Sequence, residues 1–405
     1  MSKWEEQKFG DLYLIPSRNG LTRPSSVRGA GYKFINMGEI FAYNRIGNIE
    51  TELVQLNEKE KKEMTLQKND LLFARQSLVF TGAGKCSIML DLEDVVSFES
   101  HIIRVRLNPE IANPMFYYYY FSLPYNSVKT IVQQCAQAGI RGSDLEKIKV
   151  PCPYIEIQKQ IADILSAYDN LIEANNRRIE LLEQAAQELY KEWFVRFRFP
   201  GYENAKFEDG IPKGWTIKRL ADYGRVETGK TPSTDVLENY GGEMMFVKTP
   251  DMHGNIFIIQ TEDKLSERGH NAQPKKLLPA NSIMVSCIGT AGVVSINAEP
   301  AHTNQQINSI ILNNPNELEW LYHTCKSLKD TIELFGATGA TMTNLSKGKF
   351  EKLKVVDPRE DLILEYHNKV HPLFNEIKSL MYQNQNLAAQ RDMLLPRLMS
   401  GKLEV

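Results

Sequence analysis

The second half of this sequence repeats the motifs of the first half in the same order, with an offset of roughly 210 residues. The segment TGAGKCSI at 81–88 corresponds to GTAGVVSI at 289–296, and KIKVPCP at 147–153 corresponds to KLKVVDP at 352–358. Because the matches keep the same order and nearly the same offset, the sequence predicts a duplicated chain. Whatever fold one half adopts, the other half must adopt as well.

Each half has the same internal plan, in which a globular stretch is followed by a long helix-forming segment. The globular stretches contain short β-rich runs separated by loops rich in Gly, Asn and Ser, together with shorter helical pieces. We expect globular domains at 1–152 and 199–357 and long helices at 153–198 and 358–405. A structured crossover at 199–215, rich in Pro, Gly and aromatic residues, joins the halves.

Both long segments carry apolar residues at alternating steps of four and three, which is the pattern of a coiled-coil seam. In the first segment the seam positions are Ile161, Leu165, Tyr168, Ile172, Asn175, Ile179, Leu182, Ala186, Leu189 and Trp193. In the second they are Tyr366, Val370, Leu373, Ile377, Leu380, Asn384, Leu387, Arg391, Leu394 and Leu398.

Each seam contains one asparagine, Asn175 in the first helix and Asn384 in the second. An amide left unpaired at a seam position costs free energy, whereas two opposed amides can bond and fix the register. We therefore predict an antiparallel intramolecular coiled coil in which Asn175 contacts Asn384. Helices that pack separately on their own domains, and a coiled coil between two chains, are the alternatives.

This register makes further predictions about which side chains face one another. It places Trp193 opposite Tyr366, and it leaves Tyr168 opposite Arg391 as the only mixed pair. Each helix of about 40 residues would span roughly 60 Å, since an α-helix rises 1.5 Å per residue.

The composition excludes several classes of protein. The chain has 405 residues, of which 42% are hydrophobic and 24% charged, so it can bury a core. No apolar run approaches the roughly 18 residues of a membrane span, and MSKWEEQKFG at the start has no apolar signal core, so we expect a cytoplasmic protein. The five cysteines form no CxxC pair, which argues against a disulfide framework or a structural zinc site. The net charge of −2 gives no global sign of nucleic-acid binding.

No catalytic constellation is found in the sequence. TGAGKC at 81–86 lacks the spacing of a phosphate-binding loop, and its repeat copy has no lysine. Acidic residues and a lysine at 250–251 and 262–264 resemble a nuclease pattern, but the first half has no equivalent. Among the seven histidines we identify no pair with the spacing of metal ligands. We expect no catalytic residue, no metal ligand and no cofactor in this chain.

Polar and basic side chains on loops instead suggest recognition of an anionic partner, because such residues contact phosphates and base edges in DNA complexes. A solvated or structural role is the alternative for each of them. The candidate DNA-binding residues are Arg18, Arg23, Arg28, Arg75, Gln76, Ser77 and Arg141 in the first half, and Lys230, Thr231, Lys248, Gln305, Gln306, Thr341 and Asn344 in the second.

Four segments make the chain resemble the specificity subunit (HsdS) of type I restriction–modification systems. LEKIKVPCPYIEIQKQIADIL at 145–165 and FEKLKVVDPREDLILEYHNKV at 350–370 lead into the two long helices. FVRFRFPG…GIPKGW at 194–215 and MLLPRLMSGKLEV at 393–405 complete the resemblance. The second copy departs from the first, since it has Val356-Asp357-Pro358 for the proline pair and no Gln at the equivalent position.

The resemblance implies an α+β fold with two similar globular α/β target recognition domains. A long antiparallel intramolecular coiled coil of two helices separates them, with pseudo-twofold symmetry. Each domain is expected to read one half of a bipartite double-stranded DNA target. The helices are expected to set the spacing and to dock methyltransferase (modification) subunits, two in number.

The resemblance also implies that catalysis belongs to other subunits. S-adenosylmethionine would bind to the modification subunits, and ATP with Mg²⁺ to the restriction/translocase subunits, with no cofactor in this chain. The alternatives are a recognition subunit of a type II restriction–modification enzyme, an enzyme with an unrecognised active site, or a scaffold without DNA recognition. The sequence does not give the bases that are read or the length of the spacer.

Overall fold

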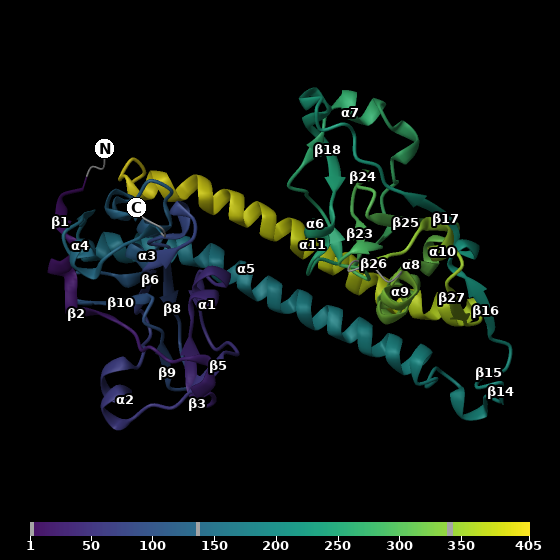
Figure 1. Ribbon diagram of the computed structural model, residues 1–405, viewed down its shortest axis with the longest axis horizontal. Coiled ribbons are helices and arrows are strands. Elements are labelled where there is room, and N and C mark those ends of the chain that lie inside the picture. Colours follow the sequence, from purple (N-terminus) through teal and green to yellow (C-terminus); the bar gives the residue numbers. More distant parts are fainter. Residues whose placement is uncertain (1–3, 135–137, 338–342) are drawn as a thin grey trace. The chain divides into compact units, whose positions relative to one another are not determined.

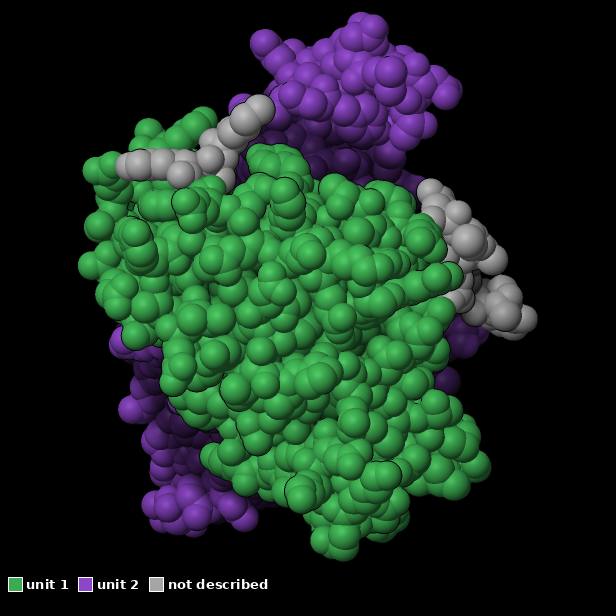
Figure 2. Space-filling model, turned by 90° about the vertical axis from the view of Figure 1, so that its left-hand side faces the viewer, with its two compact units in different colours: residues 1–172, 386–405 green, residues 173–385 purple. Residues whose placement is uncertain are grey.

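The computed structural model describes residues 4–134, 138–337 and 343–405. The chain divides into two compact units, shown in different colours in Figure 2. Unit 1 comprises residues 1–172 and 386–405, and unit 2 comprises residues 173–385. Each unit contains one globular part together with stretches of both long helices, α5 (Ile155–Tyr190) and α11 (Glu360–Met399). None of the described helices has a stretch long and apolar enough to cross a membrane.

A five-stranded sheet forms the centre of unit 1 (Figure 1). Its order is β2 (Tyr13–Asn19), β10 (Ile102–Leu107), β6 (Leu71–Ala74), β8 (Cys86–Met89) and β4 (Arg45–Ile46). Because side chains alternate along a strand, β6 serves two cores. Leu71 and Phe73 pack with the aromatic residues of α3 (Pro114–Ser122), while Leu72 and Ala74 pack into a separate cluster on the other face.

Smaller elements complete unit 1. The remaining strands form the sheets β5 (Glu52–Val54), β3 (Arg28–Ile35), β9 (Val96–Phe98); β11 (Gln133–Gln134), β12 (Ala138–Gly139), β7 (Gln76–Ser77); and β1 (Glu6–Lys8), β13 (Lys149–Pro151). The short helices are α1 (Met37–Ala42), α2 (Glu58–Met64) and α4 (Gly142–Leu145).

Unit 2 repeats this topology, which confirms the predicted duplication. Its five-stranded sheet has the order β17 (Gly224–Thr228), β25 (Ile307–Leu312), β21 (Ile283–Ser286), β23 (Val294–Asn297), β19 (Phe257–Ile258). The smaller sheets are β20 (Lys264–Leu265), β18 (Tyr240–Val247), β24 (Ala301–Thr303); β22 (Ile288–Gly289), β26 (Thr343–Asn344); and β16 (Thr216–Arg219), β27 (Lys354–Asp357). The helices are α6 (Thr249–Met252), α7 (Glu267–Asn271), α8 (Leu318–Ser327), α9 (Lys329–Gly336) and α10 (Lys347–Phe350), and a hairpin of β14 (Phe207–Glu208) and β15 (Ile211–Pro212) lies in the crossover.

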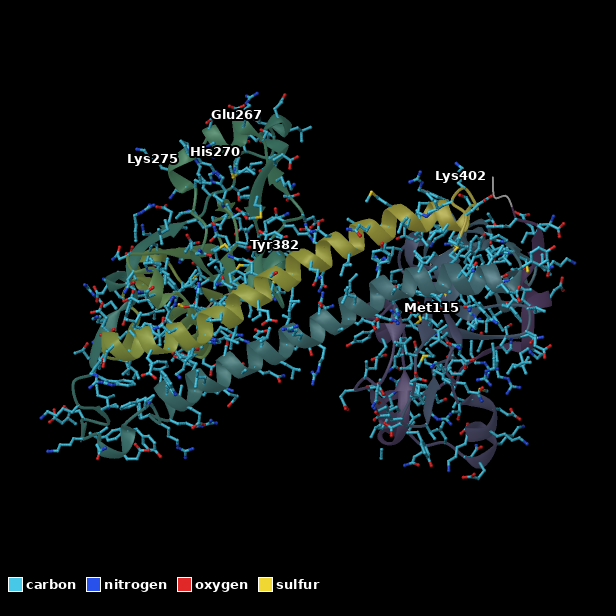
Figure 3. All side chains as sticks on the ribbon, turned by 180° about the vertical axis from the view of Figure 1, so that it is seen from behind. Met115, Glu267, His270, Lys275, Tyr382 and Lys402 are labelled. Carbon is cyan, nitrogen blue, oxygen red and sulfur yellow. The ribbon has the colours of Figure 1, made fainter. Side chains whose placement is uncertain are left out.

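In unit 2, α5 and α11 pair along the predicted seam. The Asn175 amide donates to Oδ1 of Asn384 at 2.8 Å, and the rings of Trp193 and Tyr366 lie 6.0 Å apart. Both predicted contacts are therefore confirmed, and the alternative in which these helices pack separately is wrong here. The other face of α11 contacts the globular part of unit 2, where the Tyr382 hydroxyl (Figure 3) donates to Glu299 at 3.0 Å.

In unit 1, the start of α5 packs with the end of α11. Ile161 and Leu165 share a buried hydrophobic cluster with Leu398. The predicted register places Arg391 at a seam position opposite Tyr168. The charge of Arg391 is balanced there by a residue beside the seam, because the Arg391 guanidinium donates to the buried carboxylate of Asp169. Asp169 thus compensates the charge that Arg391 carries into a partly buried position.

Candidate nucleic-acid interface

Three turns of unit 2 bring several candidate side chains together. The Thr231 hydroxyl, after β17, donates to Oε1 of Gln305 at 2.5 Å. Oε1 of the next residue, Gln306, accepts from Thr249 at 3.3 Å and from Asn304 at 3.2 Å. These bonds join the turn after β17, the turn before β25 and the start of α6 into one polar surface.

Lys248 lies at this surface, but its backbone N–H and its ammonium group already have partners within the protein. It precedes α6, where its N–H donates to Oδ2 of Asp251 at 2.7 Å. Its ammonium forms an ion pair with Asp263, and the hydrogen bond between them raises the pKa of Lys248 above its usual value. A phosphate would therefore have to compete with Asp263 for this lysine.

Asn344 reaches the same surface through a short strand pair. Ile288 pairs with Asn344 and Gly289 with Thr343. A Cβ on Gly289 would lie 3.9 Å from Nε2 of Gln306, so β22 runs directly beside the glutamine. Thr341, also a candidate, lies outside the described residues.

The candidates of unit 1 fall into two groups. In the first, Arg75 donates its N–H to the His101 carbonyl at 2.8 Å and accepts from the N–H of Ile140 at 2.9 Å. Gln76 and Ser77 follow in β7, which pairs with β12, and Arg141 follows Ile140. The structure therefore brings Arg75, Gln76, Ser77 and Arg141 together at one edge.

The second group consists of three arginines, each of which is held by a glutamate. The ion pairs join Arg18 to Glu63 at 2.7 Å, Arg23 to Glu60 at 2.6 Å, and Arg28 to Glu52. These pairs are partly exposed, and such pairs contribute little to folding stability. The arginines are thus available to a phosphate only if they exchange their carboxylate partner.

Backbone hydrogen bonds show that the surfaces of the two units are equivalent. Arg75 N–H bonds the carbonyl of His101 just as Cys287 N–H bonds that of Gln306, at 2.8 and 2.7 Å. The Arg75 carbonyl accepts from Ile140 as the Cys287 carbonyl accepts from Leu345, both at 2.9 Å. We name these surfaces rim 1, formed by 20–23, 75–77, 99–101 and 138–141, and rim 2, formed by 229–231, 287–289, 304–306 and 343–346.

A glycine fixes one turn of each rim. Gly20 N–H bonds the Ile102 carbonyl at 3.3 Å, and Gly229 N–H bonds the Ile307 carbonyl at 3.1 Å. A Cβ on Gly20 would lie 2.1 Å from the Phe98 carbonyl oxygen, and one on Gly229 would lie 2.1 Å from that of Asn304. Only glycine fits a position where another backbone approaches this closely.

The rims reveal residues that the sequence analysis missed. His101 occupies the position of Gln306, and its side chain is half exposed. Thr22 occupies the position of Thr231, since the segments GLT at 20–22 and GKT at 229–231 enter equivalent turns. The shared Gly-x-Thr pattern was a signal that could have identified both turns.

The expectation that no two histidines have the spacing of paired metal ligands was wrong. His367 and His371 do have the spacing of paired ligands, because they lie one helical turn apart on α11. Both rings face the carboxylate of Glu319, which α8 supplies.

Comparison with known proteins agrees with this architecture. A family model described as "Type I restriction modification DNA specificity domain" matches residues 1–184 and 212–360. The type I restriction enzyme HindI specificity subunit of Haemophilus influenzae is 30% identical over 475 residues, which cover 100% of both chains. The type I restriction enzyme MjaIX specificity subunit of Methanocaldococcus jannaschii is 25% identical, covering 99% of this chain and 94% of the relative.

A solved structure has the same fold. The crystal structure of the type I restriction–modification S subunit from M. genitalium aligns with a TM-score of 0.60 at 16% identity, covering 98% of this chain and 96% of that one. The duplicated sheets, the seam of α5 and α11 and the match of the family model to both halves lead to one conclusion. This chain belongs to the family of type I restriction–modification specificity subunits.

Proposed function

We propose that the two rims are the surfaces through which this specificity subunit reads a bipartite DNA target, one half per target recognition domain. The domains are the globular parts at 1–152 and 199–357. The observation that carries the proposal is the equivalence of rim 1 and rim 2, which present arginine, lysine, glutamine and threonine side chains from the same turns of a repeated fold. Such side chains can bond both phosphates and base edges.

In this proposal the chain recognises DNA and does not catalyse a reaction. Modification subunits, two in number, carry S-adenosylmethionine, and restriction/translocase subunits carry ATP and Mg²⁺. The exposed faces of α5 and α11 dock the modification subunits, and the helices set the spacing of the half-sites. The complex works in the cytoplasm, where its DNA target lies. The small net charge of −2 fits this division of roles between subunits, since partner subunits can supply phosphate contacts.

The test is a genome-wide map of adenine methylation in cells that carry the modification subunits. With the intact chain, one bipartite motif should be methylated, and deletion of the chain should remove it. Arg141→Ala in rim 1 should relax or weaken one half of the motif, and Gln306→Ala in rim 2 should affect the other half.

Controls come from exposed polar or basic residues outside the rims, one in each unit. Gln55→Ala in unit 1 and Lys275→Ala in unit 2 should leave the motif unchanged. If Arg141→Ala and Gln306→Ala alter the same half-site, or if neither changes the motif, the rims do not read the target.

A further inference from the structure

A cluster of one carboxylate and two imidazoles lies in unit 2, away from rim 2. Glu319 on α8 is fully buried, whereas the side chains of His367 and His371 on α11 are 15% and 44% exposed. Nδ1 of His367 lies 2.7 Å from Oε2 of Glu319, and Nδ1 of His371 lies 2.7 Å from Oε1. Both oxygens of one buried carboxylate are therefore held by histidines.

The electrostatic position of Glu319 is unusual. Within the described ranges, its ion-pair partners are these two histidines, and no lysine or arginine accompanies them. A fully buried carboxylate needs compensation by a positive charge, because its desolvation costs several kcal/mol. A cation shared by the carboxylate and the two imidazoles would supply that compensation.

The donor atoms are arranged as a ligand set. One atom from each of the three residues lies within 4.8 Å of the other two. Two imidazole nitrogens and one carboxylate oxygen form a set typical of zinc sites that keep a fourth position open. The spacing of four residues between His367 and His371 directs both rings to one side of α11, with ring centroids 4.6 Å apart.

An entry path leads to the cluster. A cavity of about 350 Å³ is lined by His367 and His371 together with Asn281, Ser282 and Asn316. An ion from solvent can reach the histidines through this cavity, and a water molecule can complete its coordination. The polar residues that line the cavity can bond such a water.

The two histidines have no counterparts at the equivalent positions of unit 1. Aligning Pro153 with Pro358 places Ala162 and Ser166 at the positions of His367 and His371. The packing of α11 against α8 therefore has a feature that the corresponding helix of unit 1 does not share.

We propose that Glu319, His367 and His371 bind one divalent transition-metal ion of the Zn²⁺ type, which ties α8 to α11. Each histidine supplies its Nδ1 and Glu319 supplies one carboxylate oxygen, while the fourth position faces the cavity. The ion would hold the globular part of unit 2 against the long helix. The site is separate from the DNA rims, so the proposal does not depend on their role.

The test is metal binding to the untagged full-length chain after treatment with a chelator. Co²⁺ serves as the spectroscopic probe, and Zn²⁺ is then added in competition. We expect one Co²⁺ per chain, with visible ligand-field bands but without the charge-transfer band of a thiolate ligand. Zn²⁺ should displace Co²⁺ and raise the melting temperature of the chain.

Variants assign the site. Glu319→Gln and His371→Gln should each weaken Co²⁺ binding by about tenfold or more, since disturbing even the outer partners of a metal site costs that much. His253→Gln, a change at an exposed histidine of unit 2, should leave the affinity unchanged. Circular dichroism identifies any variant that fails to fold, and His371→Gln is the most tolerable change because that side chain is half exposed.

Failure to bind Co²⁺ in the wild-type chain would overturn the proposal. So would binding that neither Glu319→Gln nor His371→Gln weakens, or a thiolate band that assigns the ion to cysteine. Each of these outcomes would leave the cluster as a hydrogen-bonded pair of histidines on a buried glutamate.

Discussion

The side-chain amide of Asn175 donates to Oδ1 of Asn384 at 2.8 Å, and the amide of Asn384 donates in turn to Asn176 at 2.8 Å. Seam positions are otherwise almost all apolar, so these amides bond at only one alignment of the two helices. The pair therefore selects the register in which Trp193 meets Tyr366.

Replacing one amide should leave its partner unsatisfied. We expect Asn175→Leu and Asn384→Leu each to destabilise the chain by about 1–3 kcal/mol, the usual penalty for an orphaned polar group. The double variant should recover part of this loss, giving a coupling energy of about 1 kcal/mol or more in a double-mutant cycle from urea unfolding. Strictly additive effects would show that the two amides do not act as a pair.

The glycines of the rims should not tolerate a side chain. Gly20→Ala and Gly229→Ala each place a Cβ 2.1 Å from a backbone oxygen, so the turn must shift. We expect a loss of about 2 kcal/mol or more in unfolding free energy and a defect in one half-site only. Gly38→Ala and Gly348→Ala are the matched controls, because nothing lies within 4 Å of their added Cβ atoms and neither has a positive φ. Equal effects in all four variants would contradict the argument.

Buried histidine should make unit 2 sensitive to acid. His302 is fully buried and bonds His270, which Figure 3 labels, at 2.9 Å. Burial, with a smaller contribution from His270, lowers the pKa of His302 to about 4, below the usual value near 6.5. Between these values the unfolded chain binds a proton that the folded chain excludes, so stability is lost as the pH falls from about 6.5 to 4.

The measurement is the melting temperature at pH 7 and pH 5. The wild-type chain should lose more stability between these values than His302→Gln, which removes the excluded proton. His253→Gln, at an exposed position, should behave like the wild type. If His302→Gln and the wild type have the same pH dependence, His302 does not titrate in this way.

The ion pairs of unit 1 allow a test of the arginine candidates. Glu63 holds Arg18 at 2.7 Å, and Glu63→Gln should free that guanidinium. If Arg18 contacts a phosphate, the variant should bind target DNA more tightly and with a steeper salt dependence. Glu58→Gln, which breaks only the pair with Lys61 on the same helix, is the control. Unchanged or weaker binding by Glu63→Gln would assign Arg18 a structural role.

The sequence was most informative where structure follows from local periodicity. Heptad spacing predicts which side chains of a helix face its partner, so the contact of Asn175 with Asn384 could be predicted although the two residues are 209 positions apart in the sequence. The duplication could be predicted as well, because motifs repeat in order even when few residues are identical.

How the rim segments come together could not be predicted, because backbone bonds between distant segments define the rims. Nothing local shows that His101 and Gln306 are equivalent, since the carbonyl of each is held by the N–H of a residue far away in the sequence. The ion pairs of Arg18 and Arg23 likewise depend on a helix about 40 residues away, which sequence spacing does not place.

The structure explains the glutamine of the motif that leads into α5, Gln158, whose role the sequence alone did not show. Its side chain is fully buried, accepts from Asn113 N–H at 2.8 Å and donates to the carbonyls of Ile111 and Pro153. The glutamine therefore fastens the start of α5 to the loop before α3. In the second half the equivalent position is Ile363, which packs into the apolar core of unit 2.

The glycine turns have a consequence for how such a protein can diversify. Backbone hydrogen bonds hold Gly20 and Gly229 in equivalent places, yet the residue that follows differs: Leu21 packs against an apolar cluster in unit 1, whereas Lys230 is exposed in unit 2. The same backbone turn therefore accepts different side chains after its glycine. Mutation or recombination at that position changes the chemistry offered to a partner while the sheet behind it keeps its path, and the two turns can vary independently of one another.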